Sequence, residues 1–246
     1  MKRVDRLLVE RGVVASRSRG QQAIRDRCVK VDGVTIDRVS TLVSPTAELS
    51  VDPKANPYVS RAGGKLRAAL DAFPVSVEGR RCVDLGASTG GFTDCLLQAG
   101  AASVVSVDVG TAQMHATIGA NPAVTVVEGM HIAEANVPRL GGPFDLVVAD
   151  LSFISMTRAA AHIARFVAAN GDVIVLVKPQ FEVGRGGLDK RGVVRDEKRR
   201  LVAVELARDA LGKAGLCHKG EIPSPVRGAS GNQEVLVWLN KDVSGV

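Results

Sequence analysis

Acidic residues end three successive apolar runs of this 246-residue chain. The first run ends at Asp84 and the second at Asp108, and Glu128 follows the third. In a parallel sheet, ligands bind at the carboxyl ends of the strands. A carboxylate there suits an ammonium group at Asp84, ribose hydroxyls at Asp108 and an adenine amine at Glu128. The three acids predict a nucleoside ligand that also carries an ammonium group.

A glycine-rich turn follows Asp84 and reads Gly-x-x-x-Gly-Gly. Glycine lets the backbone turn tightly and approach a ligand closely. A dinucleotide fingerprint has the different spacing Gly-x-Gly-x-x-Gly. The turn and the acid before it therefore favour S-adenosylmethionine over NAD. The residues predicted to bind this cofactor are Asp84, Gly86, Ala87, Ser88, Gly90, Gly91, Phe92, Asp108, Val109, Glu128, Gly129 and Met130.

A lysine, Lys178, ends a fifth apolar run. Burying a lone ammonium group is costly, so Lys178 should have a carboxylate neighbour. Asp150, at the end of the fourth run, is the expected partner. The alternative is a surface lysine whose ammonium group reaches water. No metal site is predicted, because the four cysteines lack a Cys-x-x-Cys pair and the four histidines are not paired at helical spacing.

Apolar runs of strand length alternate with helical stretches after residue 60. The runs are Cys82–Leu85, Val104–Val109, Val124–Val127, Leu146–Ala149, Val173–Val177 and Val235–Leu239. Near-continuous Val, Ile and Leu runs separated by helices predict an α/β fold with a doubly wound, mostly parallel sheet.

The first 52 residues predict a small α+β domain. A helix from Val4 should stop at Gly12, Ser16 should cap a second helix, and a hairpin should turn at Asp32-Gly33. Residues 1–60 hold 11 Lys and Arg against 7 Asp and Glu, which is +4 of the net charge of +6. This excess predicts a polyanionic partner, and a solvated basic face is the alternative. The polar segment 53–59 is predicted to be a linker, and residues 60–246 a second domain.

The chain resembles the TlyA family, whose members are known as hemolysin A or as ribosomal RNA methyltransferases. The resemblance covers both domains and rests on Arg-Val-Asp-Arg-Leu-Leu, Ser-Arg-Ala-Gly-Gly-Lys-Leu, Ala-Asp-Leu-Ser-Phe, Lys-Pro-Gln-Phe and Gly-Asn-Gln-Glu. It implies an S4 RNA-binding module fused to an FtsJ-like domain with a Rossmann-like class I methyltransferase fold, a seven-stranded sheet with helices on both faces. It also implies methylation of a ribose 2′-hydroxyl, that of cytidine, in 16S and/or 23S ribosomal RNA. Arg27 departs from the pattern, because S4 modules usually place a helix-ending glycine there.

The family's catalytic set falls on Lys65, Asp150, Lys178 and Glu234. Our hypothesis is that Lys178 is the general base, made less basic by Lys65, while the two acids orient the amines. In the S4-like part, Arg3, Arg17, Arg19, Arg25 and Lys30 are the predicted RNA phosphate contacts. The segment 184–195 resembles a mobile basic loop, which either closes over RNA or is only a surface connection.

Three other functions stay open at this point. An NAD-dependent oxidoreductase shares the fold but has the other glycine spacing. A membrane-active hemolysin needs an inserting segment, and no stretch reaches the ~20 apolar residues that span a bilayer. A non-catalytic ribosomal RNA-binding assembly factor leaves the four-residue set unexplained. Charge at the start of the chain, where a secretory leader would be apolar, predicts a cytoplasmic protein.

Overall fold

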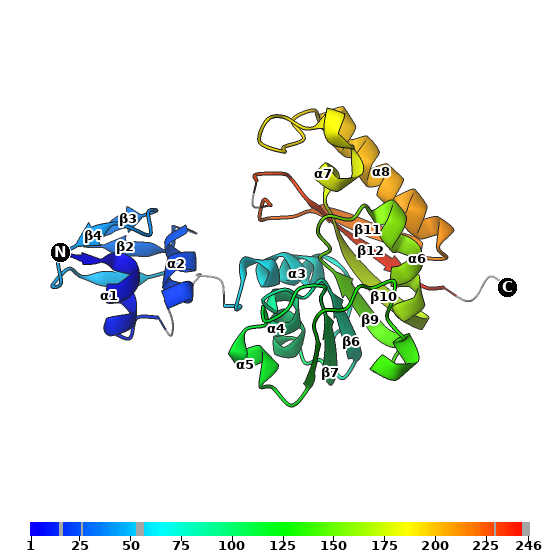
Figure 1. The fold of residues 1–246 in the computed structure, drawn as a ribbon, viewed down its shortest axis with the longest axis horizontal. Helices are drawn as coiled ribbons and strands as arrows, with labels where there is room; N and C mark the ends of the chain where they lie inside the picture. The colour runs from blue at the N-terminus through cyan, green and yellow to red at the C-terminus, as the bar shows by residue number, and fades with distance from the viewer. Residues whose placement is uncertain (15–16, 26, 53–56, 229, 243–246) are drawn as a thin grey trace. The chain divides into compact units, whose positions relative to one another are not determined.

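The computed structural model describes residues 1–14, 17–25, 27–52, 57–228 and 230–242. The chain folds into two compact units, Met1–Ser60 and Arg61–Val246 (Figure 1). Part of the predicted linker, residues 53–56, lies outside the described residues.

The described residues of the first unit form two short helices and five short strands. They are β1 (Lys2–Arg3), α1 (Val4–Glu10), α2 (Arg17–Arg25), β2 (Val29–Val31), β3 (Val34–Ile36), β4 (Leu42–Val43) and β5 (Leu49–Val51). Strands β3, β2 and β5 form an antiparallel sheet in that order, and β1 pairs with β4. Apolar side chains of α1, α2 and β2, such as Leu8, Ile24 and Val29, share one buried cluster.

Three turn predictions in this unit can be compared with the structure. The hairpin is confirmed, since Asp32 and Gly33 both have positive φ between β2 and β3, as a two-residue primed turn requires. Gly12 has φ of 68° just after α1. Arg27 has φ of 58°, so the position where S4 modules use glycine keeps its left-handed backbone here with an arginine. The predicted cap Ser16 lies outside the described residues.

The second unit contains a seven-stranded sheet. Its strands are β6 (Arg81–Leu85), β7 (Ser103–Val107), β8 (Val124–Val127), β9 (Phe144–Ala149), β10 (Val167–Val177), β11 (Cys217–Pro223) and β12 (Val235–Asn240). Their order is β11-β12-β10-β9-β6-β7-β8. The five strands from β10 to β8 are parallel, and the pairs that β12 makes with β10 and β11 are antiparallel. The six predicted runs are therefore confirmed as strands, while β11 was not predicted because its sequence, Cys-His-Lys-Gly-Glu-Ile-Pro, has no apolar run.

Helices cover both faces of this sheet (Figure 1). They are α3 (Arg61–Ala72), α4 (Gly91–Gln98), α5 (Ala116–Gly119), α6 (Met156–Phe166), α7 (Pro179–Glu182) and α8 (Glu197–Lys213), with 3-10 turns η1 (Val137–Leu140) and η2 (Arg185–Gly187). Helices α3 and α4 contact each other on one face, and α6 and α8 contact each other on the opposite face. The side chains of α6 and α8 pack on the valines of the central strands in one continuous core.

Candidate functional site

The turn after β6 is organised by a buried carboxylate. Asp84 is completely buried, and its Oδ2 accepts hydrogen bonds from the Thr93 amide (3.0 Å) and the Thr93 hydroxyl (2.7 Å). Asp84 Oδ1 has no hydrogen-bond partner among the residues that the structure describes. Burial raises the pKa of Asp84 to about 7, although the bonds from Thr93 act in the opposite direction, and the charge of Asp150 adds to the rise. The site thus contains a buried carboxyl oxygen without a donor.

Two glycines of this turn are required by their surroundings. Gly86 has φ of 84°, and a Cβ there would lie 2.7 Å from the carbonyl oxygen of Asp150. Gly90 has φ of 90° at the N-terminus of α4, and a Cβ there would meet Met114. A side chain at either position would therefore close the space between adjacent loops at the strand ends.

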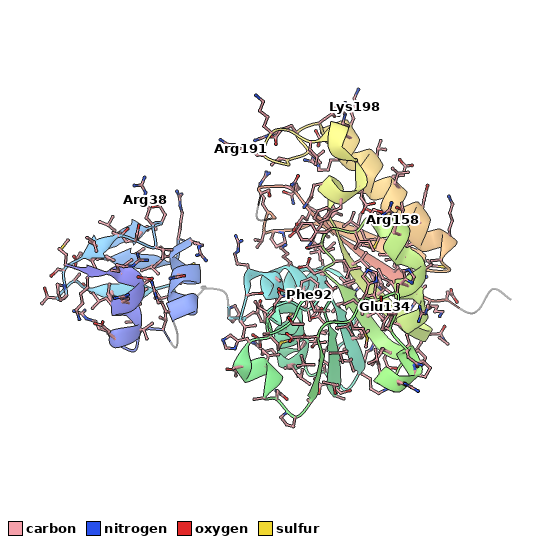
Figure 2. All side chains as sticks on the ribbon, viewed as in Figure 1. Arg38, Phe92, Glu134, Arg158, Arg191 and Lys198 are labelled. Atoms are coloured by element: carbon pink, nitrogen blue, oxygen red, sulfur yellow. The ribbon has the colours of Figure 1, made fainter. Side chains whose placement is uncertain are left out.

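A cavity of about 480 Å³ opens beside this turn, within the size range of small-molecule sites. Among the predicted cofactor residues, Gly86, Ser88, Asp108, Val109 and Met130 line it, together with Asp150. Asp84, Ala87, Gly90, Gly91, Phe92, Glu128 and Gly129 are not among its lining residues. Phe92, labelled in Figure 2, is buried in the first turn of α4 and belongs to the hydrophobic core rather than to the cavity wall.

The other two strand-end acids already accept backbone hydrogen bonds. Asp108 Oδ2 accepts from the Ser88 amide and Oδ1 from the Gly110 amide, both at 2.7 Å. Glu128 accepts from the amides of residues 112–114, and these bonds lower its pKa. Asp108 thus lines the cavity and also binds the backbone amides of Ser88 and Gly110, two other lining residues. Glu128 does not line the cavity and instead holds the 112–114 loop. Binding of an adenine amine by Glu128 stays a prediction.

The first lysine–carboxylate pair lies where β9 and β10 end. Lys178 Nζ is 2.6 Å from Asp150 Oδ1, an ion-pair contact. The same ammonium group donates to Ser152 Oγ at 2.7 Å and lies 6.0 Å from the centre of the Phe181 ring. Only 10% of the Lys178 side chain is exposed. The structure therefore gives Lys178 the neighbour that the sequence predicts and excludes a lysine that simply extends into water.

The second pair joins α3 to the start of β12. Lys65 Nζ donates to Glu234 Oε2 at 2.5 Å, and both side chains are buried. Gly228 lies against this carboxylate, since a Cβ at position 228 would be 2.5 Å from Glu234 Oε1. The pair is thus enclosed by α3 and by the loop that precedes β12.

The strand register explains why these residues meet. Val177 of β10 is paired with Val235 of β12, so Lys178 and Glu234 lie at adjacent ends of neighbouring strands. Val175 is paired with Ala149, which brings Asp150 to the same edge of the sheet. Both pairs therefore lie at the carboxyl edge of the parallel strands, the edge onto which the Asp84 turn also opens.

Two residues of this edge were not predicted from the sequence. Ser152 holds Lys178, as described above, and Phe153 is 92% exposed with φ of 65°. Phe153 lines the cavity, and its ring centre is 5.5 Å from that of Phe181. The Ala-Asp-Leu-Ser-Phe motif contains both residues but gives no indication of a left-handed backbone.

In the first unit, two of the predicted phosphate contacts also hold a buried acid, and their contact with RNA stays a prediction. Arg3 Nε and Arg17 Nε lie 3.0 and 2.8 Å from the carboxylate oxygens of Asp5, which is completely buried. Burial alone would raise the pKa of Asp5, but hydrogen bonds from Arg3, Gln21 and Arg17 outweigh it and hold this pKa well below its usual range. Arg3 and Arg17 are therefore structural ion-pair partners in this unit.

The other predicted contacts differ in surroundings. Arg25 and Lys30 are exposed and have no ion pair among the described residues. The side chain of Arg19 is outside the described part. Arg25 and Lys30 therefore keep the predicted role of phosphate contacts.

Comparison with known proteins agrees with this organisation. Residues 2–49 match the S4 domain, and residues 58–241 match the FtsJ-like methyltransferase family. The chain is 41% identical to the 16S/23S rRNA (cytidine-2′-O)-methyltransferase TlyA of Mycobacterium tuberculosis over 96% of this chain and 89% of that protein. It is 36% identical to Hemolysin A of Brachyspira hyodysenteriae over 95% of this chain and 98% of that protein.

A solved hemolysin-like structure from Streptococcus thermophilus superposes with a TM-score of 0.78 and 34% identity, covering 99% of this chain and 89% of that one. A solved S-adenosylmethionine-dependent methyltransferase of Listeria monocytogenes, only 16% identical, shares the fold of the second unit with a TM-score of 0.55. None of the helices in the described ranges is long and apolar enough to cross a membrane. The chain belongs to the FtsJ-like methyltransferase family, in the TlyA group that carries an N-terminal S4 domain.

Proposed function

We propose that this protein transfers a methyl group from S-adenosylmethionine to the 2′-hydroxyl of a cytidine ribose in 16S and/or 23S ribosomal RNA. The observation that carries the proposal is the pair of buried lysine–carboxylate contacts, Lys178–Asp150 and Lys65–Glu234, at the edge of the sheet that also opens onto the cavity. The names of the relatives, which act on ribosomal RNA cytidine, support this choice of substrate.

The cavity has the features that S-adenosylmethionine needs. Asp108 offers a carboxylate at the cavity wall, and Asp84, which does not line the cavity, stands two residues before the lining residue Gly86 with a buried carboxyl oxygen that has no donor among the described residues. Gly86 leaves space that any side chain would fill. When bound, the cofactor supplies a methyl group on a positively charged sulfur. Asp84 would favour its ammonium group and Asp108 its ribose hydroxyls.

Lys178 is proposed to take the proton of the ribose 2′-hydroxyl at Nζ. This requires the neutral amine. Asp150 Oδ1, at 2.6 Å, is proposed to orient that amine. Ser152 fixes the direction of the amine. Lys65 and Glu234 are proposed to orient the ribose and to keep the total charge of the four groups at zero.

The first unit is proposed to bind ribosomal RNA through Arg25 and Lys30. An S4 domain and an excess of positive charge both fit a polyanion. Ribosomal RNA or a ribosomal subunit is then the proposed partner, and a cytoplasmic activity is part of the same proposal. A non-catalytic assembly factor would also use this unit, but it would have no use for two buried ion pairs beside a cofactor-sized cavity.

The experiment is methyl transfer with purified components. Ribosomal subunits from cells that lack this protein are incubated with the protein and radiolabelled S-adenosylmethionine, and the labelled ribose is mapped by mass spectrometry. Incorporation at a cytidine 2′-oxygen that disappears in Lys178→Ala is the expected result. Label on a base, or no label with either subunit or with free RNA, would exclude the proposed reaction.

A further inference from the structure

Asn232 is a buried asparagine that the proposed reaction does not use. It is 1% exposed. Its Oδ1 accepts a hydrogen bond from the Val194 amide and its Nδ2 donates to the Gly192 carbonyl oxygen, both at 2.9 Å. The Asn232 side chain thus makes hydrogen bonds to the backbone of residues 192 and 194 like those that a neighbouring strand would make. It joins two loops whose bonded residues are 38 to 40 positions apart in the chain.

The segment that Asn232 holds is a loop with its own hydrogen bonds, and its predicted mobility stays a prediction. Asp189 Oδ1 accepts from the amides of Arg191 and Val193, and its Oδ2 accepts from Arg195 Nε. The Asp189 amide also donates to the Val193 carbonyl oxygen at 2.9 Å. Within this segment the side chains of Val193 and Val194 are buried. We refer to residues 189–195 as the basic loop.

Two cations on the basic loop have no acidic partner among the described residues. Lys190 and Arg191 are exposed and form no ion pair, whereas Arg195 is paired with Asp189 at 2.9 Å. Figure 2 shows Arg191 at the outer end of this loop, which follows α7 and precedes α8 in the chain. A hydrogen-bonded loop that presents two cations without ion pairs in the described ranges is suited to bind phosphate groups.

Asn232 also connects this loop to the candidate catalytic residues. It stands two residues before Glu234, whose backbone carbonyl accepts from the Ser224 amide at 2.9 Å and whose carboxylate holds Lys65. The basic loop is therefore fixed to the same segment that presents Glu234. An enzyme acting on a ribose oxygen must hold the phosphates that flank this ribose, and a rigid connection between phosphate contacts and catalytic groups would do so.

We propose that Lys190 and Arg191 form an RNA-phosphate site on the catalytic unit, and that Asn232 is the positioning residue that sets this site relative to Glu234. The proposal rests on the proposed function, because it assumes an RNA substrate. It adds a second RNA contact surface to the S4 unit, and it gives a role to the Gly-Asn-Gln-Glu motif beyond its glutamate.

The first test removes the two cations. Lys190→Ala/Arg191→Ala should raise KM for ribosomal subunits about 10-fold at moderate salt. Each lost phosphate contact should also reduce the slope of log affinity against log salt by about 0.7–0.9. The turnover number and the affinity for S-adenosylmethionine should stay unchanged. Lys213→Ala/Lys219→Ala is the matched control, because both lysines are exposed on the same unit and belong to other elements.

The second test asks whether Asn232 acts through these cations. Asn232→Ala should raise KM for the RNA substrate by a similar factor, and adding it to the Lys190→Ala/Arg191→Ala variant should produce little further change. If Asn232→Ala does not fold, Asp189→Ala loosens the same loop without altering Asn232, and it should move KM in the same direction. Affinity for S-adenosylmethionine reports whether each variant is folded around its cofactor site.

The outcomes separate this inference from the proposed function. If the wild-type protein methylates ribosomal RNA but Lys190→Ala/Arg191→Ala keeps its KM and salt slope, the phosphate site is wrong and the reaction stands. If the effects of Asn232→Ala and the double variant multiply, the positioning role is wrong. If the wild-type protein transfers no methyl group, the proposed function itself fails.

Discussion

Lys65 Nζ and Glu234 Oε2 are 2.5 Å apart although 169 residues separate them in the chain. Both side chains are buried, with 10% and 3% of their surface exposed. A buried ion pair costs desolvation energy, so replacing it with apolar residues is often neutral or stabilising. A protein that keeps such a pair at the carboxyl edge of the parallel strands gains little stability from it, which favours a role in the reaction.

Breaking this pair should separate stability from activity. Glu234→Ala leaves an unpaired buried ammonium group and should lower the free energy of unfolding by about 3–5 kcal/mol. Lys65→Met/Glu234→Leu removes both charges and should cost less, while methyl transfer is lost in both variants. Denaturant unfolding and a methyl-transfer assay measure the two quantities. Full activity in the double variant would show that the pair is only structural.

Two substitutions of Lys178, one that removes its charge and one that keeps it, test whether this residue is the general base. Lys178→Ala should reduce turnover by about 10²–10⁴-fold, the usual contribution of general base catalysis. Lys178→Arg retains a cation beside Asp150 but cannot give up a proton near neutral pH, so it should be nearly as inactive. Both variants should bind S-adenosylmethionine normally by calorimetry. Substantial activity in Lys178→Arg would mean that the residue supplies charge rather than a proton acceptor.

The pKa of Asp84, raised to about 7 by burial, predicts pH-dependent cofactor binding. An ammonium group beside Asp84 favours its charged form, so binding below pH 7 should release a proton. The affinity for S-adenosylmethionine should then increase between pH 5.5 and 7.5 and level off above. Calorimetry in buffers of different ionisation enthalpy measures the proton release. Asp84→Asn should bind more weakly and lose this dependence, and a wild-type affinity that falls over this range would contradict the assignment.

The same carboxyl group should affect stability in the absence of the cofactor. The folded-state pKa lies above the unfolded value of about 3.9, so the folded protein binds more protons between the two values. Stability from this group is therefore complete below pH 4 and decreases as the pH rises towards 7, by up to about 4 kcal/mol. Asp84→Asn should lack this decrease when chemical unfolding is followed across the range. Parallel curves for the two proteins would show that Asp84 is already ionised in the folded state.

We expect the left-handed backbone of Phe153 to lower stability while its ring contributes to RNA binding. A non-glycine residue in the left-handed region costs about 1–2 kcal/mol, and Phe153 as a whole is 92% exposed, so burial does not compensate. Phe153→Gly should therefore be at least as stable as the wild type. The ring beside Phe181 offers a surface on which a nucleobase can stack, so the same variant should show a higher KM for RNA with unchanged cofactor affinity. Thermal unfolding and steady-state kinetics test both statements.

The sequence predicts most of the sheet because buried parallel strands are near-continuous runs of apolar residues. The run Val173–Val177 is buried on both sides and apolar throughout, and its partner run Leu146–Ala149 has the same character. Strand order then brings Asp150 and Lys178 to one edge. By contrast, β11 is a mostly exposed edge strand, and nothing in its composition distinguishes it from a loop.

Surroundings of individual side chains were less predictable. Composition showed an excess of positive charge near the N-terminus but could not show that Arg3 and Arg17 turn to a buried acid, because Asp5 lies within an otherwise ordinary helical pattern. Glu128 was predicted to contact a ligand from its position alone, whereas three backbone amides of a distant loop use its carboxylate. Strand ends indicate where a site is, and long-range contacts decide which atoms face it.

The arginines of the S4 unit give the final prediction, because two kinds of cation should respond differently. Arg17→Ala removes a partner of the buried Asp5 carboxylate, so it should lower the stability of this unit by about 1–3 kcal/mol. Arg25→Ala/Lys30→Ala removes exposed cations with no ion pair in the described part of the chain. This double variant should leave stability unchanged, weaken RNA binding and reduce its salt dependence. Binding measured between 50 and ~300 mM salt, with thermal unfolding as the companion measurement, distinguishes the two classes. If Arg17→Ala changes the salt slope as much as the double variant does, Arg17 reaches RNA despite its ion pair, and the division into structural and RNA-binding cations is wrong.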